Sequence, residues 1–286
     1  MSLICSDHPQ TYALPIELFG QSRLPKIGQP GISIFDIQAR IGHSSPEIHA
    51  FFPRHLSVRQ TLESAWADTF LGKPQLNHDR DMDVDACLHW FNAELKPGSG
   101  QLPKELPHAS NVREIKTNPG SPSNRHKRAD LQPTEDTDID WADDLRFGEL
   151  SFSAQRVALF IRAVIKKPDI VILDEAFSGM DDYVRDKCKL FLGHGQERIW
   201  VWYEAGTTRV HERVTERSLS ACGPRFSGLS KEQALLCVSH VKEEVPDMVR
   251  EWICLPEANA GQVPRSGRLK SALSRRWAKW DKIWGL

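Results

Sequence analysis

The chain has 286 residues, of which 40% are hydrophobic and 26% charged, and its formal net charge is −1. This composition is typical of a globular protein with a sizeable core and one or two domains, and it gives no specific sign of nucleic-acid binding. No run of about 18 apolar residues occurs, which argues against a membrane-spanning helix. The six cysteines are scattered without paired spacing, so we expect a soluble protein of a reducing compartment.

The N-terminal third predicts strands followed by helices. Residues 31–41 alternate well enough to form strands near a sheet edge. Ser57 with Gln60 three residues later is a typical helix start, because each side chain can bond the other's backbone. A second helix is expected over residues 83–95. The apolar residues expected to face inward are Leu62, Ala65, Trp66 and Phe70 in the first helix, and Ala86, Cys87, Trp90 and Phe91 in the second.

Acidic residues alternate at the start of that second helix, at Asp81, Asp83 and Asp85. A metal site is one interpretation of this spacing. We favour a solvated helix start, because carboxylates are stabilised near the N-terminal end of the helix dipole.

Three segments carry no clear pattern of a packed core. Residues 96–138 are rich in proline and glycine and predict a disordered insertion, whose basic cluster at 125–128 is either a linker feature or a patch for nuclear import or an acidic partner. Residues 193–231 predict an irregular insertion, in which 198–203 is apolar enough for one or two strands. Residues 259–286 predict a basic amphipathic tail helix that either packs on its own domain or binds a membrane or protein partner.

The most informative segment is an apolar run that ends in two acids. Ile170 to Leu173 predict a buried strand, which Asp174 and Glu175 follow directly. A buried parallel strand delivers such residues to the carboxyl edge of its sheet, where α/β proteins bind ligands. One carboxylate can hold Mg²⁺ on a nucleotide while the other orients or deprotonates a water. A strand that ends in two acids by chance is the alternative.

Two further segments stand in a meaningful order around this strand. Upstream, residues 149–156 precede an apolar helical run over 157–165. Downstream, residues 234–238 predict another buried strand, which is followed by Ser239 and His240. The chain thus contains, in order, the segment 149–156, a helix, the acidic strand, a turn and a strand that leads to His240. This order is more informative than any one of these motifs alone.

This layout resembles that of the ATP-binding cassette (ABC) ATPases over about residues 2–255. The chain is similar to soluble cassettes such as the bacterial photorepair and molybdenum-transport ATP-binding proteins and their fungal relatives, also in the stretches 8–12, 41–49 and 238–240. The resemblance implies an α/β fold of the P-loop NTPase type with a parallel core sheet. It also implies an ABC domain over residues 1–258, with an inserted helical subdomain and signature at 55–95 and 139–166.

The resemblance also implies roles for the acidic edge. Asp174 would hold Mg²⁺, Glu175 would polarise the water that attacks the γ-phosphate, and His240 would contact that phosphate. Glu47 stands where the family has a glutamine that touches Mg²⁺ and water. The alternatives are a simple turn at Pro46-Glu47 and a core histidine at position 240.

A second nucleotide-facing surface is implied in trans. Two cassettes would sandwich ATP, and the signature of one would face the nucleotide of the other; the turn after Glu175 would be the D-loop. Phe152 and Ser153 replace the usual glycines and Ala154 a glutamine, which predicts less efficient hydrolysis at that surface because glycine allows close backbone approach to phosphate. The signature residues are Leu150, Ser151, Phe152, Ser153, Ala154 and Gln155, and the D-loop residues are Ser178, Gly179, Met180 and Asp181.

No Gly-x-x-x-x-Gly-Lys-Ser/Thr loop occurs in the sequence: the single Gly-Lys pair, Gly72-Lys73, is followed by proline. By resemblance, the sequence is expected to begin within the helix that follows this Walker A loop, with the first strands missing. Either the start is assigned too late, which we favour, or the chain is a remnant of a nucleotidase, so whether it is an enzyme stays open.

Two functions follow from these observations. The first is an ABC ATPase domain that binds and hydrolyses ATP with Mg²⁺ in a soluble, tandem-cassette protein, its partner being a second cassette of the same chain or of a dimer. The second is an inactive cassette that serves as a protein-interaction module. A cytoplasmic location is expected, or a mitochondrial one if the true N-terminus lies upstream.

Overall fold

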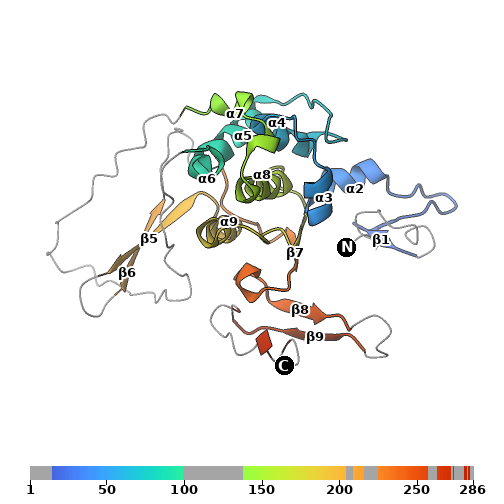
Figure 1. Cartoon of the computed structure of the whole chain (residues 1–286). Helices are drawn as coiled ribbons and strands as arrows, with labels where there is room; N and C mark the ends of the chain where they lie inside the picture. The colour runs from blue at the N-terminus through green and yellow to red at the C-terminus, as the bar shows by residue number, and fades with distance from the viewer. Residues whose placement is uncertain are drawn as a thin grey trace. The chain divides into compact units, whose positions relative to one another are not determined.

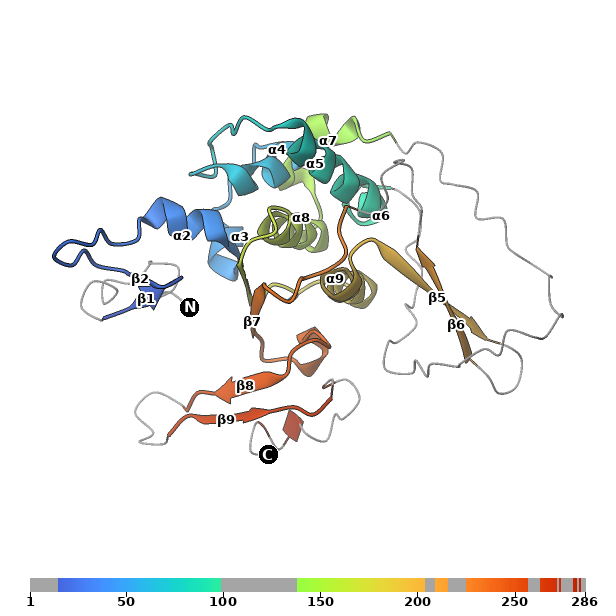
Figure 2. The same ribbon diagram turned by 180° about the vertical axis from the view of Figure 1, so that it is seen from behind.

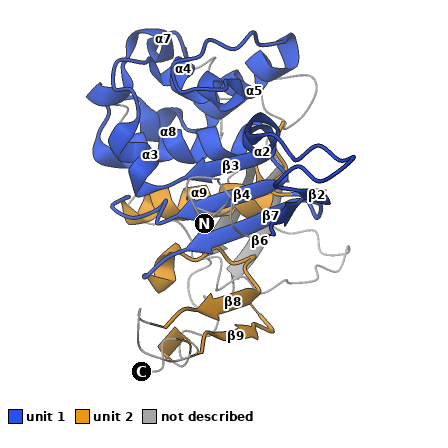
Figure 3. Cartoon of the chain, turned by 90° about the vertical axis from the view of Figure 1, so that its right-hand side faces the viewer, with its two compact units in different colours: residues 1–99, 139–180, 230–240 blue, residues 100–138, 181–229, 241–286 orange. Residues whose placement is uncertain are grey.

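The computed structural model describes residues 15–98, 138–203, 209–215, 225–256 and 263–271, and positions 273, 280, 281 and 283. Of residues 197–203 and 209–215 it describes the backbone alone. The chain divides into two compact units, one formed by residues 1–99, 139–180 and 230–240, the other by 100–138, 181–229 and 241–286 (Figure 3). The predicted insertion at 96–138 lies almost entirely outside the described residues.

A parallel three-stranded sheet forms the centre of the first unit. Its strands β3 (Ile41–Ser44), β4 (Ile170–Asp174) and β7 (Ala234–Val238) lie in the order β3-β4-β7. In the middle strand Val171, Ile172 and Leu173 are fully buried, as expected for a parallel strand covered on both faces. The predicted α/β class with a parallel sheet and the two strands expected at 170–173 and 234–238 are therefore confirmed.

One side of this sheet is covered by helices (Figures 1 and 3). α8 (Phe152–Val164) packs directly on β3 and β4. A side chain at Gly42 of β3 would place its Cβ 1.7 Å from the carbonyl oxygen of Ala163, so only glycine permits this approach of helix to strand. Further out, four helices contact α8 or each other: α4 (Val58–Glu63), α5 (His78–Trp90), α6 (Asn92–Leu95) and α7 (Trp141–Asp144).

The segment before β3 is helical where strands were expected. A short hairpin of β1 (Glu17–Leu18) and β2 (Gln21–Ser22) precedes α2 (Ile34–Arg40). The Ser33 side chain caps α2 by accepting from the Asp36 amide. The prediction of strands over 31–41 is therefore wrong for 31–40 and correct only for Ile41. Over 34–40 a local cap and the burial of Ile37 outweigh the alternation of the sequence.

The helix boundaries were predicted unevenly: α8 begins at Phe152, five residues before the expected 157, but ends within one residue of the expected 165. Ser57 and Gln60 form the expected capping box, but α4 ends at Glu63 and continues only as a 3₁₀ turn over Ser64–Trp66. α5 begins five residues earlier than expected, capped by Asn77, and the helix breaks at Phe91. Of the acidic run, Asp81 therefore lies in the first turn of α5, and Asp83 and Asp85 lie further along the helix.

The described part of the second unit includes a long helix and two hairpins. α9 (Asp182–His194) is followed by the hairpin of β5 (Glu197–Tyr203) and β6 (Arg209–Thr215), which confirms the strand prediction at 198–203. A second hairpin pairs β8 (Glu251–Cys254) with β9 (Arg265–Arg268), after a 3₁₀ turn at Lys242–Glu244 (Figure 2). The predicted tail helix is therefore wrong at 265–268, which is a strand. Most of its later part lies outside the described residues, but the described positions Trp280, Asp281 and Ile283 are helical. No helix in the described part of the chain is long and apolar enough to cross a membrane.

Candidate nucleotide site

Strand β4 places two carboxylates at the edge of the sheet. Asp174 ends the strand, and Glu175 follows with a φ of 44°, a left-handed conformation that is uncommon for a residue with a side chain. The Glu175 amide donates to the carbonyl oxygen of Val238, the last residue of β7. His240 Nε2 lies 3.1 Å from Glu175 Oε1. The parallel strands β4 and β7 thus bring the predicted acid and the predicted histidine into contact.

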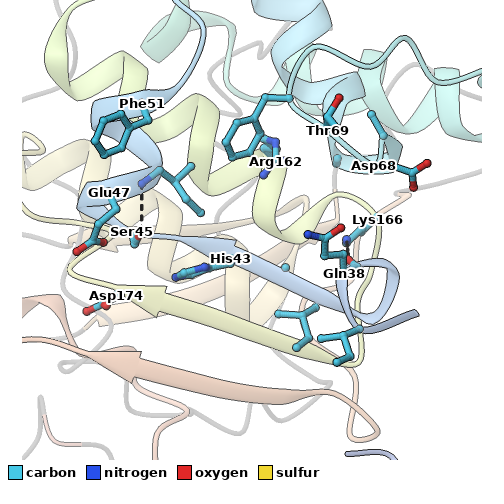
Figure 4. Close-up of a pocket in the computed structure, with 17 residues that line it drawn as sticks. Gln38, His43, Ser45, Glu47, Phe51, Asp68, Thr69, Arg162, Lys166 and Asp174 are labelled. Atoms are coloured by element: carbon cyan, nitrogen blue, oxygen red, sulfur yellow. Dashed lines mark hydrogen bonds between the residues drawn. The ribbon is translucent and has the colours of Figure 1, made fainter. Parts of the chain in front are cut away.

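A third carboxylate reaches this edge from the end of β3. Ser45 caps the short helix α3 (Pro46–Phe51) by accepting from the Ile48 amide, and Pro46 supplies its preferred first residue. Glu47 in the first turn and Asp174 line one end of a cavity of about 720 Å³ (Figure 4). The structure therefore brings Glu47 and Asp174 together across residues that are far apart in the sequence.

The pKa values of Asp174 and Glu47, at the acidic end of the cavity, shift in opposite directions. Burial raises the pKa of Asp174, the neighbouring carboxylates of Glu47 and Glu175 raise it further, and His43 opposes them. A backbone hydrogen bond and a hydrogen bond with Ser45 lower the pKa of Glu47. A bound cation would relieve the repulsion among these carboxylates that helps to raise the pKa of Asp174.

The opposite end of the same cavity is basic. Lys166 and Arg162, both from the α8 region, line it together with Asp68 and Thr69 (Figure 4). Burial lowers the pKa of Lys166 to about 8, with a contribution from Arg162. Its ammonium group donates to the Gln38 carbonyl oxygen. Sequence reasoning missed this basic end, because Arg162 and Lys166 are joined to the site only by the packing of α8 on β3.

The acidic end fits Mg²⁺ on a nucleotide better than a metal bound by protein alone. Within the described residues no group of three or more His, Cys, Asp or Glu side chains is arranged to hold a metal by itself. Mg²⁺ typically keeps several waters and binds one or two carboxylates plus phosphate oxygens. Asp174 and Glu47 match that donor set, and they form no ion pair with any lysine or arginine that the structure describes.

The signature segment forms a separate surface at the start of α8. The Ser151 hydroxyl caps the helix by accepting from the Ala154 amide. Leu150 and Ala154 are buried, and the Gln155 amide nitrogen donates to the Leu150 carbonyl oxygen. Among the six predicted signature residues, Ser151 and Phe152 are exposed, and Ser153 and Gln155 are half-buried. The Gln155 side chain is engaged with Leu150, so Ser151, Phe152 and Ser153 are the ones that we consider for contact with a ligand.

The turn after Glu175 adopts a tight conformation. The Ser178 amide donates to the Glu175 carbonyl oxygen, and the Met180 amide donates to that of Phe177. Met180 is buried and Gly179 has a φ of 75°, which favours glycine. Asp181 precedes α9 in the other unit.

His49 is a residue near these surfaces that the sequence did not single out. It lies on α3 two residues after Glu47, and its Nε2 is 2.8 Å from Gln155 Oε1. Burial lowers the pKa of His49, while the hydrogen bond to Gln155 raises it. No motif marks this histidine, because its partner is 106 positions further along the chain.

Fold and site together define an α/β protein whose parallel sheet presents carboxylates and a histidine to a polar cavity. Comparison with known proteins makes this more specific. The chain is 30% identical over 250 residues, 87% of its length, to an uncharacterized ABC transporter ATP-binding protein of Schizosaccharomyces pombe. It is 29% identical over 67% of its length to another such uncharacterized protein, from Saccharomyces cerevisiae, and 25% identical over 86% to the ABC transporter ATP-binding protein ModF of Escherichia coli.

The chain belongs to the ABC-type ATP-binding proteins, as the motif order had indicated. It spans about a third of the length of these relatives, namely 34%, 28% and 36% of the three. No family model matches the sequence.

Proposed function

We propose that this chain is an ATP-hydrolysing ABC domain, in which Asp174 and Glu47 hold Mg²⁺ on ATP and Glu175 activates the attacking water. The single observation that carries the proposal is the convergence of Glu47, Asp174, Glu175 and His240 at the carboxyl edge of one parallel sheet. Family membership supports it, because relatives over most of the chain are ABC ATP-binding proteins.

The geometry suggests how each side chain contributes. Mg²⁺, when bound, neutralises charge on the phosphates and on Asp174. The contact with His240 Nε2 orients the Glu175 carboxylate, leaving its second oxygen to accept a proton from water. His240 is well exposed, so its ring is also accessible to a phosphate oxygen.

A second cassette is the partner in this proposal. Ser151, Phe152 and Ser153 would face the nucleotide held by that partner, where the N-terminus of α8 offers backbone amides to phosphate. The phosphate-binding loop required at each nucleotide is not found among the 286 residues. The inactive interaction module remains the alternative that the experiment must test.

The test is steady-state hydrolysis of MgATP by the endogenous protein purified from its source, compared with the same protein carrying Glu175→Gln. We expect the substitution to lower kcat by about 10²-fold or more, because it removes a general base. Glu251→Gln changes an exposed carboxylate of the other unit and should leave kcat unchanged. Turnover that survives Glu175→Gln, or that is absent from the unmodified protein, would contradict the proposal.

A further inference from the structure

Helix α3 touches the proposed metal site with one side and the signature segment with the other. Successive residues of an α-helix are rotated by about 100°, so Glu47 and His49 are roughly 200° apart and point to opposite sides of α3. Glu47 lines the cavity with Asp174, and His49 does not line it but contacts α8. A short rigid helix therefore lies between the two surfaces.

A chain of two hydrogen bonds joins His49 to the first signature residue. The Gln155 amide nitrogen donates to the Leu150 carbonyl oxygen over 2.9 Å. Its amide oxygen consequently faces His49, and His49 donates to it from Nε2 over 2.8 Å. An apolar side chain at position 49 would fill the same space but would remove this donor.

The His49 ring also packs on Phe152 of the signature segment and on Phe147, which precedes that segment. Its centroid lies 4.9 Å from that of Phe152 and 6.2 Å from that of Phe147, each in an edge-on arrangement that favours attraction between aromatic rings. Phe147 is fully buried, whereas Phe152 is half exposed. His49 thus lies between the half-exposed ring of Phe152 and the buried ring of Phe147.

Phe152 continues the path to the turn after Glu175. A Cβ at Gly179 would lie 2.4 Å from Phe152 Cε1, so the ring occupies the space that a larger residue would need. The φ of 75° favours glycine at 179, and a Cβ there would force the Phe152 ring to shift. The phenylalanine that replaces a signature glycine is therefore seated on the turn of its own chain.

We propose that His49 is a positioning residue that couples Glu47 on α3 to the signature segment and, through Phe152, to Gly179. The inference rests on the proposed function, in which α3, the signature segment and the turn after Glu175 all lie at bound nucleotide. A shift of α3 at the metal site is passed to Leu150 through Gln155 and to Gly179 through Phe152. Ser151 and Ser153 move with this segment, and they are the hydroxyls offered to the partner's nucleotide.

Amide hydrogen exchange in the nucleotide-free protein tests the coupling directly. In His49→Phe the ring is kept and the donor is lost, so we expect amides of residues 150–156 and 178–181 to exchange about tenfold faster, the effect of one net hydrogen bond. His49→Gln restores a donor nitrogen and should return exchange to within about threefold of the unmodified protein. Amides of α5 should not change in either variant, and exposed His78→Phe should change neither segment.

Two results would overturn the coupling: unchanged exchange at 150–156 in His49→Phe, or an equal increase throughout α5, which would mean general loosening. Gly179→Ala provides a second route, since displacement of Phe152 should accelerate exchange at 150–156 with His49 intact. Unchanged exchange there would contradict the Phe152 step.

Turnover separates this inference from the proposed function. Because His49 does not line the cavity, His49→Phe should lower kcat for MgATP about tenfold at an unchanged KM, and His49→Gln should restore it. A raised KM with unchanged kcat would contradict a positioning role. Absence of turnover in the unmodified protein would refute the proposed function, while hydrogen exchange would still decide the coupling.

Discussion

Two acidic clusters of the first unit look alike in sequence and differ in what neutralises them. In the helical layer Asp81, Asp85 and Asp143 surround Arg59, with nitrogen–oxygen distances of 3.2, 2.5 and 3.4 Å. At the sheet edge no described lysine or arginine pairs with Asp174 or Glu47. The first cluster carries its own cation and therefore stabilises the fold, whereas the second needs a cation from outside and is suited to binding.

This difference also explains the acidic run of α5. Asp81 and Asp85 pair with Arg59 from α4, and Asp83 pairs with Lys167 at 3.3 Å. The run is thus paired with cations from outside α5. Asp81 lies in the first turn and is half exposed, as expected of a solvated helix start, whereas Asp83 and Asp85 lie further along the helix and are less exposed. Spacing alone did not reveal this, because Arg59 lies about twenty positions upstream.

Arg59→Met should produce the largest effect on stability. It leaves the carboxylates of α5 and α7 without their common partner, and burial already raises the pKa of nearby Glu63, which Arg59 opposes. We expect the free energy of unfolding to fall by about 2 kcal/mol, less than for a fully buried pair because Asp81 and Asp143 are partly exposed. Urea denaturation measures it.

Arg40→Gln is the matched control for that measurement, since it breaks the half-exposed pair with Asp169 and should change stability by less than about 0.5 kcal/mol. If Arg59→Met and Arg40→Gln lowered the free energy of unfolding equally, the acidic cluster around Arg59 would have no special structural role.

Lys166→Met should raise stability at pH 7, by about 1 kcal/mol after allowance for partial screening. The folded-state pKa of about 8 lies below the ordinary value of 10.5, so the charged form is disfavoured by the fold. Stability of the unmodified protein therefore increases as pH rises from about 8 to 10.5, and the advantage of the variant should vanish there. Thermal unfolding of both proteins at pH 7 and at pH 10.5 checks this; an advantage that persists at high pH would exclude a charge effect.

Asp174→Asn should give the smallest effect and the opposite sign to Arg59→Met. The raised pKa means that ionised Asp174 destabilises the nucleotide-free fold. This destabilisation is lost as pH falls through the raised pKa, and it is absent below the ordinary carboxyl pKa. We expect a gain of about 0.5 kcal/mol or less at pH 7 and none at acidic pH, because the side chain is only partly buried. Thermal unfolding without nucleotide and Mg²⁺ measures this gain. If Asp174→Asn instead destabilised the protein, Asp174 would have a structural role like that of the acids around Arg59.

The sequence by itself determined the order of the motifs, the two apolar strands that end at Asp174 and near His240, and the helix start at Ser57. These features are local: burial of a parallel strand and capping of a helix leave signals within a few neighbouring residues. The absence of a Gly-Lys-Ser/Thr loop is likewise visible in the sequence alone.

The tertiary structure decided everything that depends on distant partners. Residues 34–40 are helical because Ile37 joins a core with Ile41 and Ile172, and residues 265–268 are a strand because β8 pairs with them. The same holds for the cation beside each acidic cluster and for the contact of His49 with Gln155. A packing partner more than a hundred positions away leaves no periodic signal in the sequence, so only the folded chain shows which acids are neutralised and which are left to bind.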